Sequence, residues 1–206
     1  MAEAMMDAGD GDAGKRARRS GVSRQQILDV AAKLFRARGY TETSLRDIGK
    51  QVGMKAGSIY YHFTSKEELA TEVLQIGVRR VHDAVVLAVE ALGKDASVKS
   101  RVRAAMVAHL ETLLDESDFT SAHIHCFPYV PEGLRRKLSG ERQEYEEVWR
   151  RLLDDASKQG ALAPGVDRAA ARLAILGALN WSLEWYDPKQ GLPIHLTSGL
   201  LAAFLR

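Results

Sequence analysis

Apolar residues recur every three or four positions along most of the chain, the spacing that aligns side chains on one face of an α-helix. The first such stripe consists of Ile27, Val30, Ala31, Leu34 and Phe35. Ser23 and Gln26 form the pattern of a capping box in front of it, and Gly39 is a typical C-terminal signal behind it. The pattern therefore predicts a helix that begins after Ser23 and ends at Gly39.

Two short helices are predicted after the first one. Ser44 is a suitable N-cap for the earlier of the two, whose buried face is expected to consist of Leu45, Ile48 and Val52. Gly53 breaks this helix, and the next one follows over roughly residues 56–62. Ile59 and Phe63 are expected to face inward from it, against the first helix.

The remainder of the chain is also predicted to be helical. Ser65 and Glu68 form the pattern of a capping box, which opens a long helix that runs to about residue 92. Further helices are expected near residues 97–114, 132–158 and 168–186, and from about residue 194. Residues 118–133, which contain two prolines, are expected to be irregular. We find no strand pattern and no internal repeat, so the predicted fold class is all-α.

Charge is distributed unevenly along the 206 residues, although the net charge is only +2. Residues 15–66 carry 12 Lys and Arg against 3 Asp and Glu, whereas residues 67–206 carry 17 against 20. An N-terminal third this basic indicates contact with a polyanion. Residues 1–20 end in "KRARRS" and are predicted to be a disordered arm that lies along phosphates or in a minor groove when bound. A solvated tail is the alternative.

Other features of the composition narrow the class of protein. The single cysteine, Cys126, excludes an internal disulfide and fits a reducing compartment. No apolar run reaches the length of about 20 residues that a membrane span needs. The N-terminus lacks the basic-then-apolar order of a signal peptide. We therefore expect a cytoplasmic protein without a membrane segment, and no cofactor is indicated.

Two short helices joined by a glycine-containing turn and packed on a preceding helix describe a helix-turn-helix, whose second helix enters the major groove of DNA. Small residues at its start allow close approach of the backbone, and Lys66 with the amides of Thr64 and Ser65 is expected to hold a phosphate. The residues predicted to contact DNA are Thr43, Ser44, Lys55, Ala56, Gly57, Ser58, Tyr60, Tyr61, His62, Thr64 and Lys66.

The segment "TSLRDIGKQVGMKAGSIYYHFTSKEEL" resembles the TetR family of transcriptional regulators. The positions that match the family pattern in register are Thr43, Ile48, Gly53, Gly57, Tyr60, His62, Phe63, Lys66 and Leu69. The mild departures are Ser44, Gly49, Val52 and Ile59. The predicted organisation is the arm over residues 1–20 and a DNA-binding domain over 21–66. By the resemblance, residues 67–206 form a helical ligand-binding and dimerisation domain.

The resemblance also implies that the last two helices pair with those of a second copy as a four-helix bundle. The segment "RAAARLAILGALNWSLEWY" is small and apolar over a wide face, which suits this role better than an ordinary core alone. The residues expected at the dimer interface are Ala174, Leu176, Ala178, Leu179 and Leu183.

By the same resemblance, the middle helices line a cavity for a small effector. The candidate lining is Met106, His109, Leu110, Leu113, Phe127, Tyr145, Trp149 and Trp181, an apolar set with a few polar groups. The segment "NWSLEWYDP" is similar to members that regulate fatty-acid or sterol breakdown and sense acyl-CoA thioesters. Residues 135–137, "RRK", are interpreted as a solvated charge run, with contact to a CoA phosphate as the alternative.

Two other classes of function are kept open. His123, His125 and Cys126, with His109 as an extra ligand, suggest a metal-sensing regulator, although a second pair of ligands is missing. The histidines also allow a helical enzyme, but no nucleophile motif or phosphate loop accompanies them. We predict that the chain is not an enzyme. The interpretation preferred from the sequence is a dimeric repressor that binds a palindromic operator in double-stranded DNA and is released by a small hydrophobic or acyl-CoA-type effector.

Overall fold

The computed structural model describes residues 22–116 and 118–206, so the predicted arm lies outside the described residues. The elements are α2 Arg24–Arg38, α3 Leu45–Gln51, α4 Ala56–Ile59, α5 Lys66–Glu90, α6 Val98–Glu111, the π-helical turn η1 Thr112–Glu116, α7 Asp118–Cys126, the 3₁₀ turn η2 Phe127–Tyr129, α8 Glu132–Lys137, α9 Ser139–Lys158, α10 Arg168–Trp185, the 3₁₀ turn η3 Pro188–Gln190 and α11 Ile194–Phe204. No strand forms within these residues, and the all-α prediction is confirmed. None of the described helices has the length and apolar character needed to cross a membrane.

The predicted starts of the first two helices are confirmed by their caps. Ser23 Oγ accepts from the amide of Gln26 at 3.2 Å, and the Gln26 side chain accepts from the Ser23 amide at 2.8 Å. Ser44 and Asp47 make the same reciprocal pair at the start of α3. These bonds satisfy amides that would otherwise be unpaired in the first turn, and so fix where each helix begins.

The start of α5 differs in one detail from the prediction. Ser65 Oγ accepts from the amide of Glu68 at 3.1 Å, as expected of an N-cap. The Glu68 carboxylate, however, accepts from the amide and the hydroxyl of Thr64, at 2.7 and 2.6 Å, rather than from Ser65. The predicted capping box is therefore wrong in its second half, because the chain turns so that Thr64 is nearer to the carboxylate.

The stretch expected to be irregular is mostly helical. Residues Asp118–Cys126 form α7, and only the segment around Pro128 and Pro131 departs from an α-helix. The sequence shows no clear periodicity here because α7 is buried on several sides, between α2 and α5, so small polar residues such as Thr120 and Ser121 lie inside. The predicted helix over residues 132–158 is also interrupted, at the buried Leu138 between α8 and α9.

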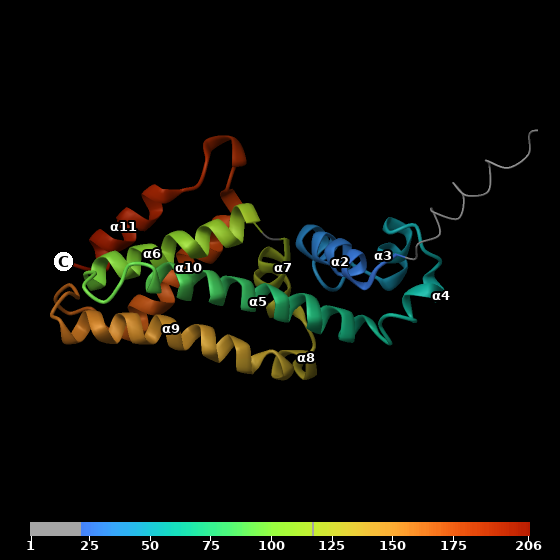
Figure 1. Ribbon diagram of the computed structural model, residues 1–206, viewed down its shortest axis with the longest axis horizontal. Coiled ribbons are helices and arrows are strands. Elements are labelled where there is room, and N and C mark those ends of the chain that lie inside the picture. Colours follow the sequence, from blue (N-terminus) through green and yellow to red (C-terminus); the bar gives the residue numbers. More distant parts are fainter. Residues whose placement is uncertain (1–21, 117) are drawn as a thin grey trace, which may run out of the picture.

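The long helix α5 runs along the molecule and joins its two ends (Figure 1). At one end it packs against α2, on which α3 and then α4 follow, and at the other it packs against α6 and α9. Helix α7 contacts both α2 and α5, while α10 and α11 complete the far end against α6 and α9. Helices α5 and α7 thus provide the main contacts between the N-terminal helices and the rest of the described chain.

The buried apolar residues form two clusters. The N-terminal core combines residues of α2–α4 and the first turns of α5 with Phe119, Ala122, Cys126, Val130, Leu134 and Leu138 from the α7–α8 region. The C-terminal core combines the later turns of α5 with residues of α6, η1, α9, α10 and α11. The core of the helix-turn-helix is therefore completed by residues far along the chain, such as Cys126, which lies 91 positions after its partner Phe35.

Gly77 lies where α5 crosses α7. A side-chain carbon at this position would overlap the Phe119 carbonyl group and would lie 2.9 Å from His123 Cβ. The Thr120 hydroxyl donates to the Gly77 carbonyl at 3.1 Å across the same crossing. Glycine thus permits the close approach of the two helices at the boundary between the two cores.

Candidate DNA interface and ligand groove

The α4 segment separates its side chains into an inner and an outer set, as predicted. Ile59 and Phe63 are fully buried in the N-terminal core. Tyr61 is 95% exposed and Tyr60 57% exposed, and Ser58 is exposed beside them. Amide hydrogen bonds from Tyr61, His62 and Phe63 to residues 58 and 59 continue the turn beyond α4 and hold this alternation. Two aromatic rings with hydroxyl groups therefore stand free on the surface.

The other predicted DNA contacts divide into exposed and occupied groups. The exposed ones are Ser44, Lys55, Gly57 and Thr64, and His62 is half-buried. Ala56 is the first residue of α4. Thr43 is buried, and its hydroxyl donates to the carbonyls of Gly39 and Leu34 at 2.9 and 3.3 Å. Thr43 is thus already used to fix the turn before α3 and does not reach the exposed surface.

Lys66 is held by the turn between α2 and α3. Its Nζ donates to the Thr41 carbonyl at 3.3 Å and lies 4.1 Å from the centre of the Tyr40 ring. This partial burial lowers the pKa of Lys66. The amide of Thr64, expected to help bind a phosphate, instead donates to Glu68, whose pKa is lowered by the hydrogen bonds from Thr64. The structure therefore corrects the predicted phosphate site: the Thr64 amide is occupied and Lys66 also has a structural role.

Sequence reasoning did not single out two exposed cations on α3, Arg46 and Lys50. They precede the turn to α4 and belong to the basic third of the chain. Exposed cations beside a recognition helix are typical phosphate contacts. The excess of basic residues over 15–66 was the signal that pointed to them.

The residues predicted to line a ligand cavity are mostly packed together. Buried in or against the C-terminal core are Met106, His109, Leu110, Leu113, Tyr145 and Trp149. The cavity beside them, bordered by Tyr145 and Asn180, has a volume of only about 40 Å³. Phe127 lies outside this core, where its ring stacks on that of His123 with 5.5 Å between the ring centres. Trp181 is 65% exposed. The structure thus brings six of the eight residues together but leaves little space between them.

A polar chain crosses this core. His109 contacts the Tyr145 hydroxyl through Nδ1 at 2.5 Å and the Asn180 carbonyl oxygen through Nε2 at 3.1 Å. Burial lowers the pKa of His109 to about 4 and raises the pKa of Tyr145. A neutral imidazole that donates from Nε2 to Asn180 and accepts the Tyr145 hydroxyl at Nδ1 pairs both ring nitrogens, the hydroxyl and the Asn180 oxygen. The side chain of Asn180 is thereby held in one orientation.

A larger open groove lies next to this chain, and we call it the α2–α10 groove. Its volume is about 490 Å³. Helix α2 contributes Arg36, the α7–η2 segment contributes His125 and Tyr129, and α10 contributes Asn180 and Trp181. Arg36 donates to the Asp118 carboxylate at 2.8 Å at the edge of this region. Sequence reasoning missed Arg36 because nothing along the chain indicates that α2 meets α10 residues across one groove.

One face of α10 leaves large apolar side chains in solvent. Leu173 is 64% and Trp185 46% exposed, in line with the exposed Trp181 and Ala174. Of the residues predicted for dimerisation, Ala174 is exposed, while Leu176, Ala178 and Leu183 are half-buried. Leu179 is fully buried in the C-terminal core, so it is not part of this surface. The exposed face is thus rotated away from Leu179.

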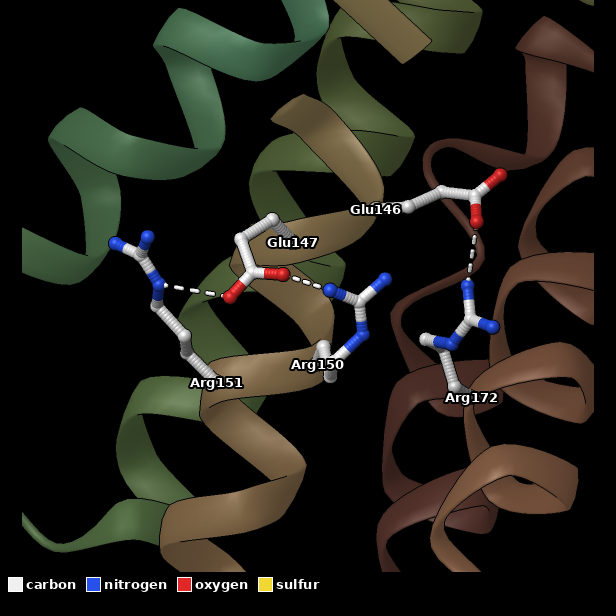
Figure 2. Close-up of polar contacts among 5 residues, drawn as sticks. All are labelled: Glu146, Glu147, Arg150, Arg151 and Arg172. Atoms are coloured by element: carbon white, nitrogen blue, oxygen red, sulfur yellow. Dashed lines mark hydrogen bonds and ion pairs between the residues drawn. The ribbon is translucent and has the colours of Figure 1, made fainter. Parts of the chain in front are cut away.

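Ion pairs help to orient α10 on its neighbour. Figure 2 shows Arg172 of α10 pointing to Glu146 of α9, and the two are joined by a bond of 2.7 Å. Within α9, Glu147 accepts from Arg150 and Arg151. Each of these three arginines is thus paired with a carboxylate of α9.

The residues considered for a metal site do not converge. His123 is buried, and its Nδ1 donates to the Leu74 carbonyl at 2.9 Å. The thiol of Cys126 donates to the Phe35 carbonyl at 3.4 Å, whereas His125 is exposed. No group of three metal-binding side chains is found among the residues that the structure describes. The metal-sensing alternative therefore has no support in the geometry.

Known proteins resemble this chain over most of its length. The family model described as bacterial regulatory proteins, tetR family, matches residues 27–73, and the Tetracyclin repressor-like C-terminal domain matches residues 95–192. The HTH-type transcriptional repressor KstR2 of Rhodococcus jostii is 27% identical over 187 residues, covering 87% of this chain and 84% of the relative.

Solved structures of similar fold also point to this family. The TetR family transcriptional regulator PfmR from Thermus thermophilus superposes with a TM-score of 0.75 at 29% identity, covering 90% of this chain and 96% of that one. AibR, in a structure with isovaleryl coenzyme A and operator DNA, has the same fold, with a TM-score of 0.77 at 24% identity over 88% of this chain and 97% of that one. The family and these relatives are transcriptional regulators rather than enzymes. Its helix-turn-helix, its helical C-terminal region and both family matches show that the chain belongs to the TetR family of bacterial transcriptional regulators.

Proposed function

We propose that this TetR-family repressor acts in the cytoplasm as a homodimer that binds a palindromic operator and is released by a small apolar or acyl-CoA-type effector. The observation that carries the proposal is the division of the α4 segment, with Ile59 and Phe63 buried and Tyr60 and Tyr61 exposed. The exposed rings, with Lys55 and Ser58, offer hydrogen bonds and apolar edges to bases in a major groove. The cations of α3 supply the phosphate contacts.

The occupant that we propose for the exposed α10 face is a second copy of the chain. Leu173 and Trp185 are exposed apolar side chains on a helix that its own protomer covers on one side only. Such a face is costly to leave in water. Twofold pairing through it places two recognition helices on one side of DNA, where successive major grooves lie about 34 Å apart. The operator is then a palindrome.

The dimer is tested by sedimentation of two matched variants. Leu173→Asp places a charge in the proposed interface and should convert the dimer to monomer at micromolar concentration. Leu87→Asp makes the same change on α5, where Leu87 is 66% exposed, and should leave the dimer intact. Equal behaviour of the two variants would contradict the proposed interface.

The effector is proposed to act by linkage. A ligand that binds more tightly to the conformation with wrongly spaced α4 helices lowers operator affinity by the same coupling free energy. Helix α5 connects the DNA-binding end to the C-terminal core and is the natural lever. The structure of AibR with isovaleryl coenzyme A makes acyl-CoA thioesters the first effectors to test.

The operator is tested by selection of bound sequences from random duplex DNA with the purified full-length protein. We expect a short palindrome to be enriched, and a footprint with two equivalent halves. Enrichment of a single unpaired half-site would argue against the symmetric dimer. No enrichment at all, with protein that is folded and dimeric, would argue against sequence-specific DNA binding without an added ligand.

A further inference from the structure

The α2–α10 groove has the size and chemistry of a ligand site. Its volume of about 490 Å³ lies in the range of small-molecule pockets, whereas the interior cavity beside Tyr145 measures only about 40 Å³. Tyr129 and Trp181 are exposed aromatic side chains on two different elements that line the groove, suited to contact an apolar or ring-shaped group. The groove, rather than the packed core, is therefore the place where this conformation has room for a ligand.

Asn180 supplies a fixed polar contact at the inner wall of this groove. Its carbonyl oxygen is engaged by His109, and its side-chain amide nitrogen makes no hydrogen bond among the described residues. Because Asn180 borders both the groove and the small cavity behind it, this nitrogen is available to an acceptor atom of a bound molecule. The buried Tyr145–His109 pair holds the amide in place, which gives the contact directional specificity.

Arg36 supplies a cation at the outer wall, from the DNA-binding end of the molecule. Its guanidinium pairs with Asp118, but both side chains are partly exposed, and exposed ion pairs contribute little to stability. A ligand anion inside the groove can therefore take the place of the Asp118 carboxylate. Glu184 also lines the groove, so the anionic group must lie near Arg36 and away from α10's carboxylate.

We propose that the α2–α10 groove binds an apolar or aromatic molecule with one anionic group, which pairs with Arg36 in place of Asp118 while an acceptor atom contacts Asn180. The effector is then held directly by a residue of the helix-turn-helix. The binding of a ligand in the groove does not depend on the proposed function. The effect of that ligand on DNA binding does depend on it.

The position of Arg36 explains how occupancy reaches the DNA-binding surface. The preceding residue, Phe35, is fully buried in the N-terminal core, and its carbonyl accepts the thiol of Cys126 on α7. A shift of Arg36 from Asp118 to a ligand changes the attachment of α2 to α7 at this point. Since α3 and α4 pack on the same core, the change alters the placement of the recognition helix relative to α5.

The test uses 8-anilinonaphthalene-1-sulfonate, an aromatic sulfonate, as the probe and follows its fluorescence with the full-length protein. We expect Arg36→Gln to weaken probe binding at least fivefold. Arg38→Gln removes the same charge from the same helix outside the groove and should change binding less than twofold. Asp118→Asn should strengthen binding about threefold, because the competing carboxylate is gone.

Equal losses in the two arginine variants, weaker binding by Asp118→Asn, or no probe binding by the unaltered protein would each overturn the proposal. If Arg36→Gln does not fold, as judged by circular dichroism, Arg36→Lys should retain binding within threefold while Asp118→Asn still strengthens it.

Operator affinity is measured separately with the selected duplex. The probe should lower it at least fivefold in the unaltered protein but not in Arg36→Gln. Failure to find any operator would contradict the proposed function, while the probe titrations still decide the groove.

Discussion

The two cores of the molecule differ in how they are made. The N-terminal core consists almost entirely of apolar side chains, held by short helices with well-defined caps. The C-terminal core surrounds a polar chain from Tyr145 through His109 to Asn180. The first is joined to α7 by side-chain bonds to backbone carbonyls, such as that of Cys126 to Phe35, whereas the second is crossed by bonds between side chains of three helices.

The difference also concerns where each core ends. The sequence places the end of the DNA-binding domain at residue 66, but its core continues to Leu74 on α5 and includes Phe119 and Leu134. The helix-turn-helix is therefore packed on elements that border the α2–α10 groove. A ligand shifts DNA affinity only as far as it binds two conformations differently, and contact between the two cores allows the ligand site and the DNA surface to favour the same conformation.

The largest expected effect comes from a change at the boundary between the cores. Gly77→Ala should lower the free energy of unfolding by about 3 kcal/mol, because the added methyl group overlaps the Phe119 carbonyl where α5 crosses α7. Gly133→Ala on α8 has open space around it and should raise stability slightly, by about 0.5 kcal/mol, because alanine restricts the unfolded chain. Urea unfolding measures both. Similar values for the two variants would mean that the helices move apart without cost.

The two buried histidines are expected to make the stability of the protein depend on pH. Burial lowers the pKa of His109 to about 4 and the pKa of His123 to about 3. An unfolded histidine takes up a proton below about pH 6.5, so over the window from there down to these values the unfolded state binds more protons and stability falls as pH falls. We expect a loss of about 2 kcal/mol per histidine between pH 7 and pH 5.

This pH dependence is assigned by two variants. His109→Gln and His123→Gln should each be less stable at pH 7 and should each lose less stability between pH 7 and pH 5 than the unaltered protein. Urea unfolding at the two pH values gives the difference. A slope that neither variant reduces would assign the acid sensitivity to other groups.

A smaller effect on stability is expected at Lys66, a residue that both stabilises the fold and is predicted to contact DNA. Lys66→Ala removes the bond to the Thr41 carbonyl and the contact with Tyr40, and should lower stability by about 1 kcal/mol. Operator and random DNA should both bind more weakly, with the salt slope reduced by about one. Lys50→Ala, an exposed cation on α3, should reduce the salt slope without the loss of stability. If the salt slope of DNA binding is unchanged in Lys66→Ala, Lys66 stabilises the fold but does not contact a phosphate.

The smallest effect on stability is expected at the most exposed aromatic residue. Tyr61→Ala should change the free energy of unfolding by less than about 0.5 kcal/mol, because the side chain is 95% exposed. Operator affinity should fall by about 2 kcal/mol, and Tyr61→Phe should separate the hydroxyl from the ring. Fluorescence anisotropy with the selected duplex measures this. Unfolding of Tyr61→Ala would show that the ring packs in the core after all.

The sequence predicted the helix-turn-helix well because its signals are local. Ser23 with Gln26 and Ser44 with Asp47 are three residues apart, and such pairs decide a helix start wherever the chain lies. The prediction for α7 failed because the signal was not local: Thr120, Ser121 and His123 are polar, but each finds a backbone carbonyl on another segment. Only the packed structure satisfies them.

By itself, the sequence determined the helical fold class, the outward face of the α4 segment and the membership of a regulator family, since periodicity, caps and a short motif carry that information. The tertiary structure alone decided that Thr43 and the Thr64 amide are already occupied, that Leu179 is buried, and that the predicted cavity is closely packed. It also brought Arg36 of α2 beside residues of α10. These outcomes depend on pairs such as His109 and Asn180, 71 residues apart, whose contact follows from the packing of whole helices and not from any pattern along the chain.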